Sequence, residues 1–328
     1  MGQIESTNPR GEVPLLPYES CNLGSINLSK MVKDGEVDWD RLRGVVRLAV
    51  HFLDNVIDAS KYPLPQVDKM TKGNRKIGLG VMGFAEMLIQ LNIPYDSNEA
   101  VEVAEKVMSF ISKEALKRSE ELALERGSFP NFDESIWKER GYKALRNATL
   151  TTIAPTGTIS IIAGTSSGIE PLFAISFVRN VIGTQLFETN PLFEKVAKEH
   201  GFYSSDLMTE IARKGSIQEM KNIPEDVRRI FVTAFDIEPE WHVKMQAAFQ
   251  KYVDNAVSKT VNLPQDATLD DVYKIYWLAY KLKCKGITVF RYGSRREQVL
   301  VTQPPEEQYI RAASEYAGGS PSIRCPTC

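Results

Sequence analysis

The chain has 328 residues, of which 25% are charged and 43% are hydrophobic, and its formal net charge is −2. This length allows one large or two ordinary domains with a sizeable buried core. The small net charge gives no strong electrostatic basis for binding nucleic acid or an anionic membrane. No apolar run approaches the ~20 residues of a membrane span, and four cysteines are too few for a disulfide framework. We therefore expect a cytoplasmic protein that binds neither nucleic acid nor membranes.

The spacing of apolar residues predicts four long helices. Ser97 is a good N-cap for the second of them, and Gly127 can end it. Thr268 and Asp271 have the spacing of a capping box at the start of the fourth. The four predicted helices cover residues 42–57, 97–127, 245–256 and 268–286.

Short β-branched runs between the helices predict strands at residues 149–153, 174–178, 259–262 and 287–290. Strands that alternate with long helices are typical of a buried parallel sheet, so the predicted fold class is α/β. Residues 301–328 contain the sequence TQPPEE and a small, polar end, and we expect them to form a flexible tail.

Two glycine-containing segments resemble nucleotide- or phosphate-binding motifs. Gly78–Gly83 matches GxGxxG, but polar residues precede it where a dinucleotide-binding site needs a buried strand, so we favour close helix packing at these glycines. Pro155–Thr158 lies between a predicted strand and the apolar run Ile159–Ala163, which we expect to be helical. Free N–H groups at such a helix start can bind phosphate, although an ordinary turn would have the same composition. Glu170 follows in a loop and could be a site carboxylate, but a lone glutamate in a loop is usually solvated, which is the interpretation we favour.

An ordered set of motifs resembles the large catalytic subunit of ribonucleotide reductase. The motifs occur in the family's order between about residue 6 and residue 300, and the set as a whole is highly specific. Metal-radical reductases carry adjacent tyrosines after the last barrel strand, whereas residues 289–292 here read VFRY. The PTGT and RYGSR segments instead resemble the adenosylcobalamin-dependent, class II enzymes. The motifs are Asn8-Pro9-x-Gly11-Glu12, Cys21–Leu28, Arg75–Gly83, Ala154–Thr158, Gly168–Pro171 and Gly286–Arg295.

This resemblance implies a particular fold. The chain would be the second five-stranded half of the ten-stranded ribonucleotide reductase α/β barrel, with helices packed outside and a mobile C-terminal tail. Residues 1–300 would form this half, with the finger loop near residues 8–12, and residues 301–328 would be the tail ending in Cys-x-x-Cys. The first half, which carries the allosteric elements and one reducing cysteine, would be a missing partner.

The resemblance also implies an oxidoreductase that replaces the ribose 2′-OH of a ribonucleotide with hydrogen through a thiyl radical. Glu12 would be the general base, Asn8 would hold a ribose hydroxyl, and Cys21 would be one of two reducing thiols. Adenosylcobalamin would be the cofactor, and a dithiol such as thioredoxin the reductant. The substrate would be a ribonucleoside di- or triphosphate, and the complete enzyme would be a homo-oligomer. The substrate phosphates would lie against Pro155, Thr156, Gly157, Thr158 and Ile159, and Cys325 and Cys328 would be the tail dithiol.

Cys284 and the histidines receive no catalytic role, and no cysteine is assigned to a metal site. Cys284 lies near the end of a predicted amphipathic helix, which suggests a structural residue. Cys325 and Cys328 have zinc-ligand spacing, but a second pair is missing, so we assign no metal site. The histidines lie in helical or loop segments with no evident partner; they are His51, His200 and His242.

Position 10 departs from the family pattern. The radical cysteine should stand between Pro9 and Gly11, where this sequence has Arg10. A guanidinium has no thiol hydrogen to abstract and stays charged, so we expect Arg10 to pair with Glu12 and the chain alone to be inactive. The chain could be a fragment of a split or intein-interrupted gene, carry a sequence error or engineered change, or be a degenerate paralogue.

Two other functions stay open. The chain could be a catalytically inactive barrel half that binds nucleotide or docks to an active subunit. It could also be a fragment of a metal-radical, class I large subunit, which the missing tyrosine pair disfavours.

Overall fold

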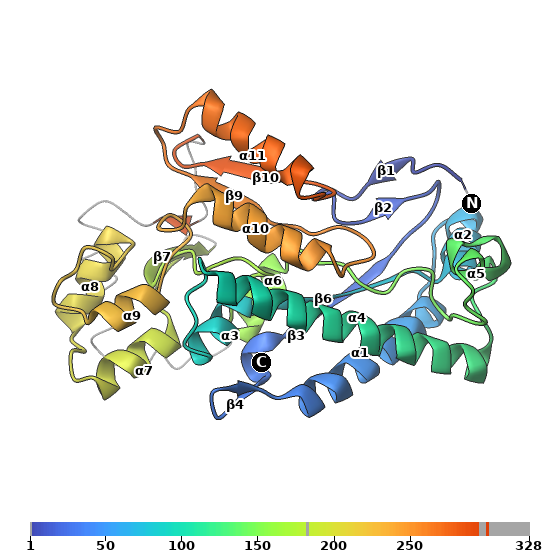
Figure 1. Cartoon of the computed structure of the whole chain (residues 1–328), viewed down its shortest axis with the longest axis horizontal. Coiled ribbons are helices and arrows are strands. Elements are labelled where there is room, and N and C mark those ends of the chain that lie inside the picture. Colours follow the sequence, from blue (N-terminus) through green and yellow to red (C-terminus); the bar gives the residue numbers. More distant parts are fainter. Residues whose placement is uncertain (1, 182–183, 295–299, 302–328) are drawn as a thin grey trace. The chain divides into compact units, whose positions relative to one another are not determined.

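The structure is a computed structural model that describes residues 2–181, 184–294 and 300–301 (Figure 1). It divides into two compact units. The first consists of Met1–Glu170 and Glu238–Arg291, and the second of the described residues within Pro171–Ile237 and Tyr292–Cys328. No helix among the described residues is both long enough and apolar enough to cross a membrane.

The first unit contains most of the regular structure. Its strands are β1 (Ser6–Thr7), β2 (Pro14–Leu15), β3 (Asn22–Asn27), β4 (Val32–Lys33), β5 (Glu36–Val37), β6 (Ile77–Met82), β9 (Thr260–Leu263) and β10 (Thr288–Arg291). Its α-helices are α1 (Trp39–Ala59), α2 (Pro65–Asn74), α3 (Phe84–Gln90), α4 (Asn98–Arg126), α5 (Ile136–Glu139), α6 (Gly157–Ala163), α10 (Pro239–Gln250) and α11 (Leu269–Lys281). Two short 3-10 helices are η1 (Leu28–Lys30) and η2 (Phe132–Glu134).

In the first unit five parallel segments, here called strand positions, pair one after another: β3, β6, residues 149–153, the segment from Val257 through β9, and β10. β3 pairs with β6, and a parallel bridge from Leu79 to Thr151 adds residues 149–153. A second parallel bridge, from Ile153 to Val257, leads into the segment that continues as β9, and β9 pairs with β10. All six residues of β6 are buried, as expected for a central parallel strand. The predicted five-stranded parallel half-barrel is therefore confirmed, although residues 149–153 form bridges rather than a regular strand.

The two longest helices form where local signals predict them. Asp38 caps α1 by accepting the Arg41 N–H at 3.0 Å, and Ser97 caps α4 in the same way. Figure 1 shows α1 and α4 beside each other, joined by the ion pair of Arg47 and Glu121. Their buried residues recur every three or four positions, so each helix turns one apolar face inward.

The glycines at positions 78 and 80 lie inside β6, so the interpretation as helix packing is wrong. A Cβ at Gly80 would stand 2.1 Å from the backbone oxygen of Thr152 on the neighbouring strand position. A Cβ at Gly78 would stand 2.4 Å from a Leu23 side-chain atom on β3. These glycines permit close approach of strands, and no dinucleotide-binding loop forms because the motif lies within a strand rather than after one.

Two predicted helices end earlier than expected. α10 stops at Gln250, whose amide then donates to the carbonyls of Val253 and Asn255, because the chain must turn there into the next parallel strand. α11 begins with the predicted capping box but ends at Lys281, before the left-handed Lys283 (φ 61°).

The second unit differs from the expected parallel arrangement. Its strands β7 (Ser176–Val181), β8 (Thr184–Thr189) and β11 (Leu300–Val301) form an antiparallel sheet, so the predicted strand at 174–178 belongs to a different sheet type. The helices are α7 (Pro191–Glu199), α8 (Ser205–Lys214) and α9 (Glu225–Ile230). Phe193 and Phe231 meet edge to face at 5.2 Å in its core. Residues 302–328 of the expected tail, including Cys325 and Cys328, lie outside the described residues.

Candidate functional site

Residues 8–12 lie in the turn of a short hairpin between β1 and β2. The Asn8 side-chain oxygen accepts the Val13 N–H at 3.0 Å, and the Asn8 carbonyl accepts the Gly11 N–H at 2.9 Å. Gly11 has φ +75°, a value that favours glycine. Asn8 therefore shapes this turn through its oxygen, which leaves its NH₂ group as the part that could donate to a ligand.

Glu12 is the most constrained residue of this turn. Its side chain is only 2% exposed, and its backbone carbonyl accepts the Ala256 N–H at 2.8 Å and the Thr152 hydroxyl at 2.9 Å. Its Oε2 atom is buried and has no hydrogen-bond partner among the described residues. A buried, unpartnered carboxylate oxygen is costly, and it points to a ligand or proton donor that belongs at this position.

Cys21 directly precedes β3 and lies in the electrostatic neighbourhood of Glu12. Burial raises the pKa of its thiol to about 12, the Lys76 ammonium opposes this effect, and the carboxylates of Glu19 and Glu12 add to it. Lys76 is itself held by Glu19 at 2.7 Å. Cys21 therefore carries its proton at neutral pH.

We expect the proton on Cys21 to slow its alkylation. With Cys325 and Cys328 replaced by serine, iodoacetamide at pH 8 should modify Cys21 about tenfold more slowly than Cys284, whose pKa is raised to about 11 by burial. Mass spectrometry of the two tryptic peptides measures both rates. Because the folded state holds these protons more tightly than the unfolded state, stability should fall as pH rises from about 9 toward about 12. Fast alkylation of Cys21 at pH 8 would contradict this.

Arg10 does not form the expected ion pair. Its side chain is exposed at the tip of the turn, and within the described part of the chain it makes no ion pair with Glu12. The expectation that Arg10 neutralises Glu12 is therefore wrong, because the turn directs the two side chains into different environments.

The segment Pro155–Ile159 forms the predicted turn into a helix. Thr156 is the N-cap of α6, and the first helical bond runs from the Ser160 N–H to the Thr156 carbonyl at 2.9 Å. Gly157, Thr158 and Ile159 are exposed, and their N–H groups precede that first bond. The turn follows residues 149–153, whose Thr152 contacts Glu12, so Glu12 and the turn are linked through one strand position.

A buried polar cluster that the sequence did not predict surrounds Lys259. Its Nζ donates to Glu170 Oε2 at 2.6 Å and contacts His242 Nδ1 at 2.8 Å, so Glu170 is not the solvated glutamate that we expected. The other two histidines also have partners, namely Arg126 for His51 and the Val196 carbonyl for His200. The sequence signals were the motif Gly168–Pro171, which contains Glu170, and a lysine at the start of a predicted buried strand.

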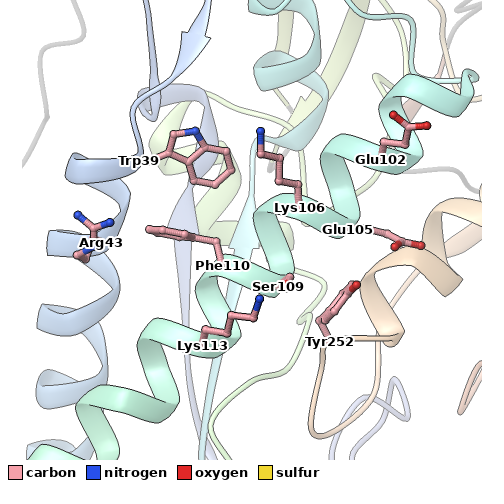
Figure 2. Close-up of a pocket in the computed structure, with 9 residues that line it drawn as sticks. All are labelled: Trp39, Arg43, Glu102, Glu105, Lys106, Ser109, Phe110, Lys113 and Tyr252. Carbon is pink, nitrogen blue, oxygen red and sulfur yellow. The ribbon is translucent and has the colours of Figure 1, made fainter.

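A groove of about 650 Å³ lies elsewhere on the first unit, between the start of α1, the middle of α4 and the residues after α10. Figure 2 shows Trp39 and Phe110 close together, with Lys106 beside them and Tyr252 across the groove. Cations and carboxylates both line it, and it includes none of the predicted site residues. Among the described residues, no group of three or more His, Cys, Asp or Glu side chains could hold a metal ion.

Comparison with known proteins gives the same family from sequence and from structure. The family model described as "Ribonucleotide reductase, barrel domain" matches residues 1–290. The chain belongs to the ribonucleotide reductase family. It is 58% identical over 317 residues to a vitamin B12-dependent ribonucleoside-diphosphate reductase of Thermoplasma acidophilum, a match that covers 94% of this chain and 41% of that protein.

Other members of the ribonucleotide reductase family support this assignment. A vitamin B12-dependent ribonucleoside-diphosphate reductase of Mycobacterium tuberculosis (strain CDC 1551 / Oshkosh) is 54% identical over 324 residues, which cover 99% of this chain and 46% of that protein. The solved class Id ribonucleotide reductase alpha subunit of Actinobacillus ureae has a TM-score of 0.73 at 25% identity and covers 88% of this chain and 54% of its own. The chain thus spans less than half the length of these two curated reductases.

Proposed function

We propose that the chain is the C-terminal catalytic half of an adenosylcobalamin-dependent, class II ribonucleotide reductase. Such an enzyme reduces ribonucleoside di- or triphosphates to 2′-deoxyribonucleotides. The observation that carries the proposal is the buried Glu12 carboxylate, whose Oε2 has no partner among the described residues. The vitamin B12-dependent names of the relatives at 54% and 58% identity support the subclass.

In this proposal each candidate site residue has a distinct task. Glu12 accepts the proton of the ribose 3′-OH, the Asn8 amide donates to a ribose hydroxyl, and Cys21 supplies a proton and an electron on the other sugar face. The protonated thiol of Cys21 suits that task. Thr156–Ile159 would bind the substrate phosphates through backbone N–H groups at the start of α6, where Thr156 is buried and Gly157, Thr158 and Ile159 are exposed, and Pro155 would precede them in the same turn. Cys325 and Cys328 would re-reduce the site with a thioredoxin-like dithiol.

Position 10 limits what this chain can do with the cofactor. Adenosylcobalamin, when bound to a complete enzyme, supplies the radical that this chemistry requires. A cysteine thiol must receive that radical, and Arg10 offers no S–H bond. The residues of this chain therefore do not fit the cofactor's role at that position, and we expect no turnover by the chain alone.

The exposed Arg10 favours a second candidate function. A catalytically inactive barrel half would keep the phosphate-binding turn and bind nucleotide, or dock to an active subunit, without the radical step. The two functions share the substrate site and differ only in the thiol at position 10. Binding experiments therefore test the site, and activity measurements distinguish the functions.

The substrate site can be tested by adding a negative charge to the turn. Thr158→Glu should weaken the binding of cytidine 5′-diphosphate (CDP) at least about tenfold, because the carboxylate repels the phosphates at short range. Cytidine, which has no phosphate, should bind equally to both proteins. Isothermal titration calorimetry measures both affinities.

A matched control adds the same charge at another helix start. Asn98→Glu, an exposed substitution in the first turn of α4, should leave CDP affinity unchanged. An equal loss for both variants, or no CDP binding by the unmodified chain, would contradict the proposed site.

A further inference from the structure

Thr156, in the turn proposed to bind phosphate, has an unfavourable backbone conformation. Its φ of 54° and ψ of 25° lie in the left-handed region, which is rare for a β-branched residue. Such a conformation persists only where the surroundings enforce it, and it is most frequent at functional sites. Relaxation of Thr156 would change the direction of the N–H groups that follow it.

The loop after α6 holds Thr156 in place. The Gly168 N–H donates to Thr156 Oγ1 at 2.7 Å, and the hydroxyls of Ser160 and Ser167 meet at 2.9 Å. Gly168 is itself left-handed, with φ +52°, and a Cβ there would stand 3.1 Å from the Ala154 oxygen. The turn and this loop therefore form one interlocked segment.

Two carboxylates anchor this loop to the rest of the first unit. At its start, Glu86 on α3 accepts from the Thr165 hydroxyl and from both the N–H and the hydroxyl of Ser166, at 2.6 to 2.9 Å. At its end, Glu170 Oε1 accepts the Thr260 N–H at 2.7 Å, and Oε2 accepts from Lys259 Nζ at 2.6 Å.

The second anchor depends on the buried cation of Lys259, which needs hydrogen-bond acceptors inside the protein. Its side chain is fully buried, and its Nζ donates to the Thr260 carbonyl and contacts His242 Nδ1 as well as Glu170. Because an ammonium can only donate, His242 Nδ1 is the acceptor. A buried ion pair contributes little net stability, whereas it is well suited to fixing one arrangement of the chain.

We propose that Glu170 and Lys259 are positioning residues for substrate phosphate, acting through Gly168 and Thr156 on the N–H groups at the start of α6. The connection begins with the hydrogen bond from Lys259 to Glu170, follows the short chain segment from Glu170 back to Gly168, and ends with the hydrogen bond from Gly168 to Thr156. The inference rests on the proposed phosphate role of this turn, and it names residues that touch no substrate.

The test removes both charges together, since one charge left alone could unfold the chain. The variant Glu170→Leu/Lys259→Met replaces the pair with apolar side chains of similar size. Glu170→Gln/Lys259→Met is the conservative partner, because glutamine still offers an acceptor to the Thr260 N–H. The matched control, Glu105→Leu/Lys251→Met, removes an ion pair between α4 and the end of α10.

Three quantities are measured on the full chain: affinity for CDP, affinity for cytidine, and amide hydrogen exchange across residues 156–168. Glu170→Leu/Lys259→Met should weaken CDP binding at least about tenfold, leave cytidine binding within about twofold, and speed exchange of the Gly168 N–H at least about tenfold. The glutamine variant should fall between this variant and the unmodified chain. The control pair should match the unmodified chain in all three.

Several outcomes would overturn the inference. These are unchanged CDP affinity, an equal loss for CDP and cytidine accompanied by a lower melting temperature, or unchanged exchange at Gly168. If the unmodified chain binds no CDP, the proposed substrate site fails by itself. The exchange measurement then still decides whether Glu170 and Lys259 hold the turn.

Discussion

Replacement of Gly80 with alanine should strongly destabilise the first unit. The new Cβ would stand 2.1 Å from the backbone oxygen of Thr152, a distance that non-bonded atoms do not adopt. The position of a Cβ is fixed by its own backbone and the oxygen belongs to the backbone of the adjacent strand position, so no side-chain rotation can relieve the contact. We expect the free energy of unfolding to fall by more than about 3 kcal/mol, beyond the usual range for an overpacked core.

Gly44→Ala supplies the control for this prediction. Gly44 is exposed in the second turn of α1, and a Cβ there would meet nothing within 4 Å. Alanine at this position should stabilise the chain by up to about 1 kcal/mol, because glycine is a poor helix former. Urea denaturation followed by circular dichroism measures both changes. A Gly80→Ala variant as stable as the unmodified chain would show that the strand positions do not approach each other this closely.

Arg10→Cys should convert an inactive chain into part of an active reductase. The test mixes the purified chain with the N-terminal part of the Thermoplasma acidophilum relative that lies outside the match, together with adenosylcobalamin, a dithiol and CDP. Formation of deoxycytidine diphosphate should rise at least about 10³-fold over the Arg10 protein, as expected when an essential catalytic group is supplied. Chromatographic separation of the products measures the rate.

Two further variants test whether the activity depends on the thiol at position 10 and on the carboxylate of Glu12. Arg10→Ser removes the cation without supplying an S–H bond, and it should stay inactive. Arg10→Cys/Glu12→Gln supplies the thiol but removes the general base, so its rate should be at least about 10²-fold lower than that of Arg10→Cys. Turnover by the unmodified chain would refute the prediction that the protein with Arg10 is inactive. Equal inactivity of every variant would favour the barrel half that binds nucleotide without catalysis.

Several parts of the fold could be predicted because their signals are local. Ser97 caps α4 and the box of Thr268 with Asp271 opens α11, since each cap joins residues only three positions apart. The alternation of strands and helices was enough to predict a parallel sheet. The ordered motifs pointed to the reductase barrel, which the family match then confirmed.

Element ends and the antiparallel unit could not be predicted in the same way. α10 ends where the chain turns toward a strand position paired with Ile153, about a hundred residues earlier in the sequence. The pairing of β7 with β8 reverses the expected direction, because a short β-branched run carries no information about its partner strand.

The sequence alone was enough to predict the reductase family and the half-barrel and to reveal the anomaly at Arg10, because motif order and residue identity are properties of the chain itself. The tertiary structure was needed to show that Glu12 has an unpartnered carboxylate oxygen, that the glycines of β6 lie against Thr152, and that Lys259 pairs with Glu170. Each of these depends on desolvation or on contacts between distant segments. Both arise only when the chain packs, so no local pattern of residues can reveal them.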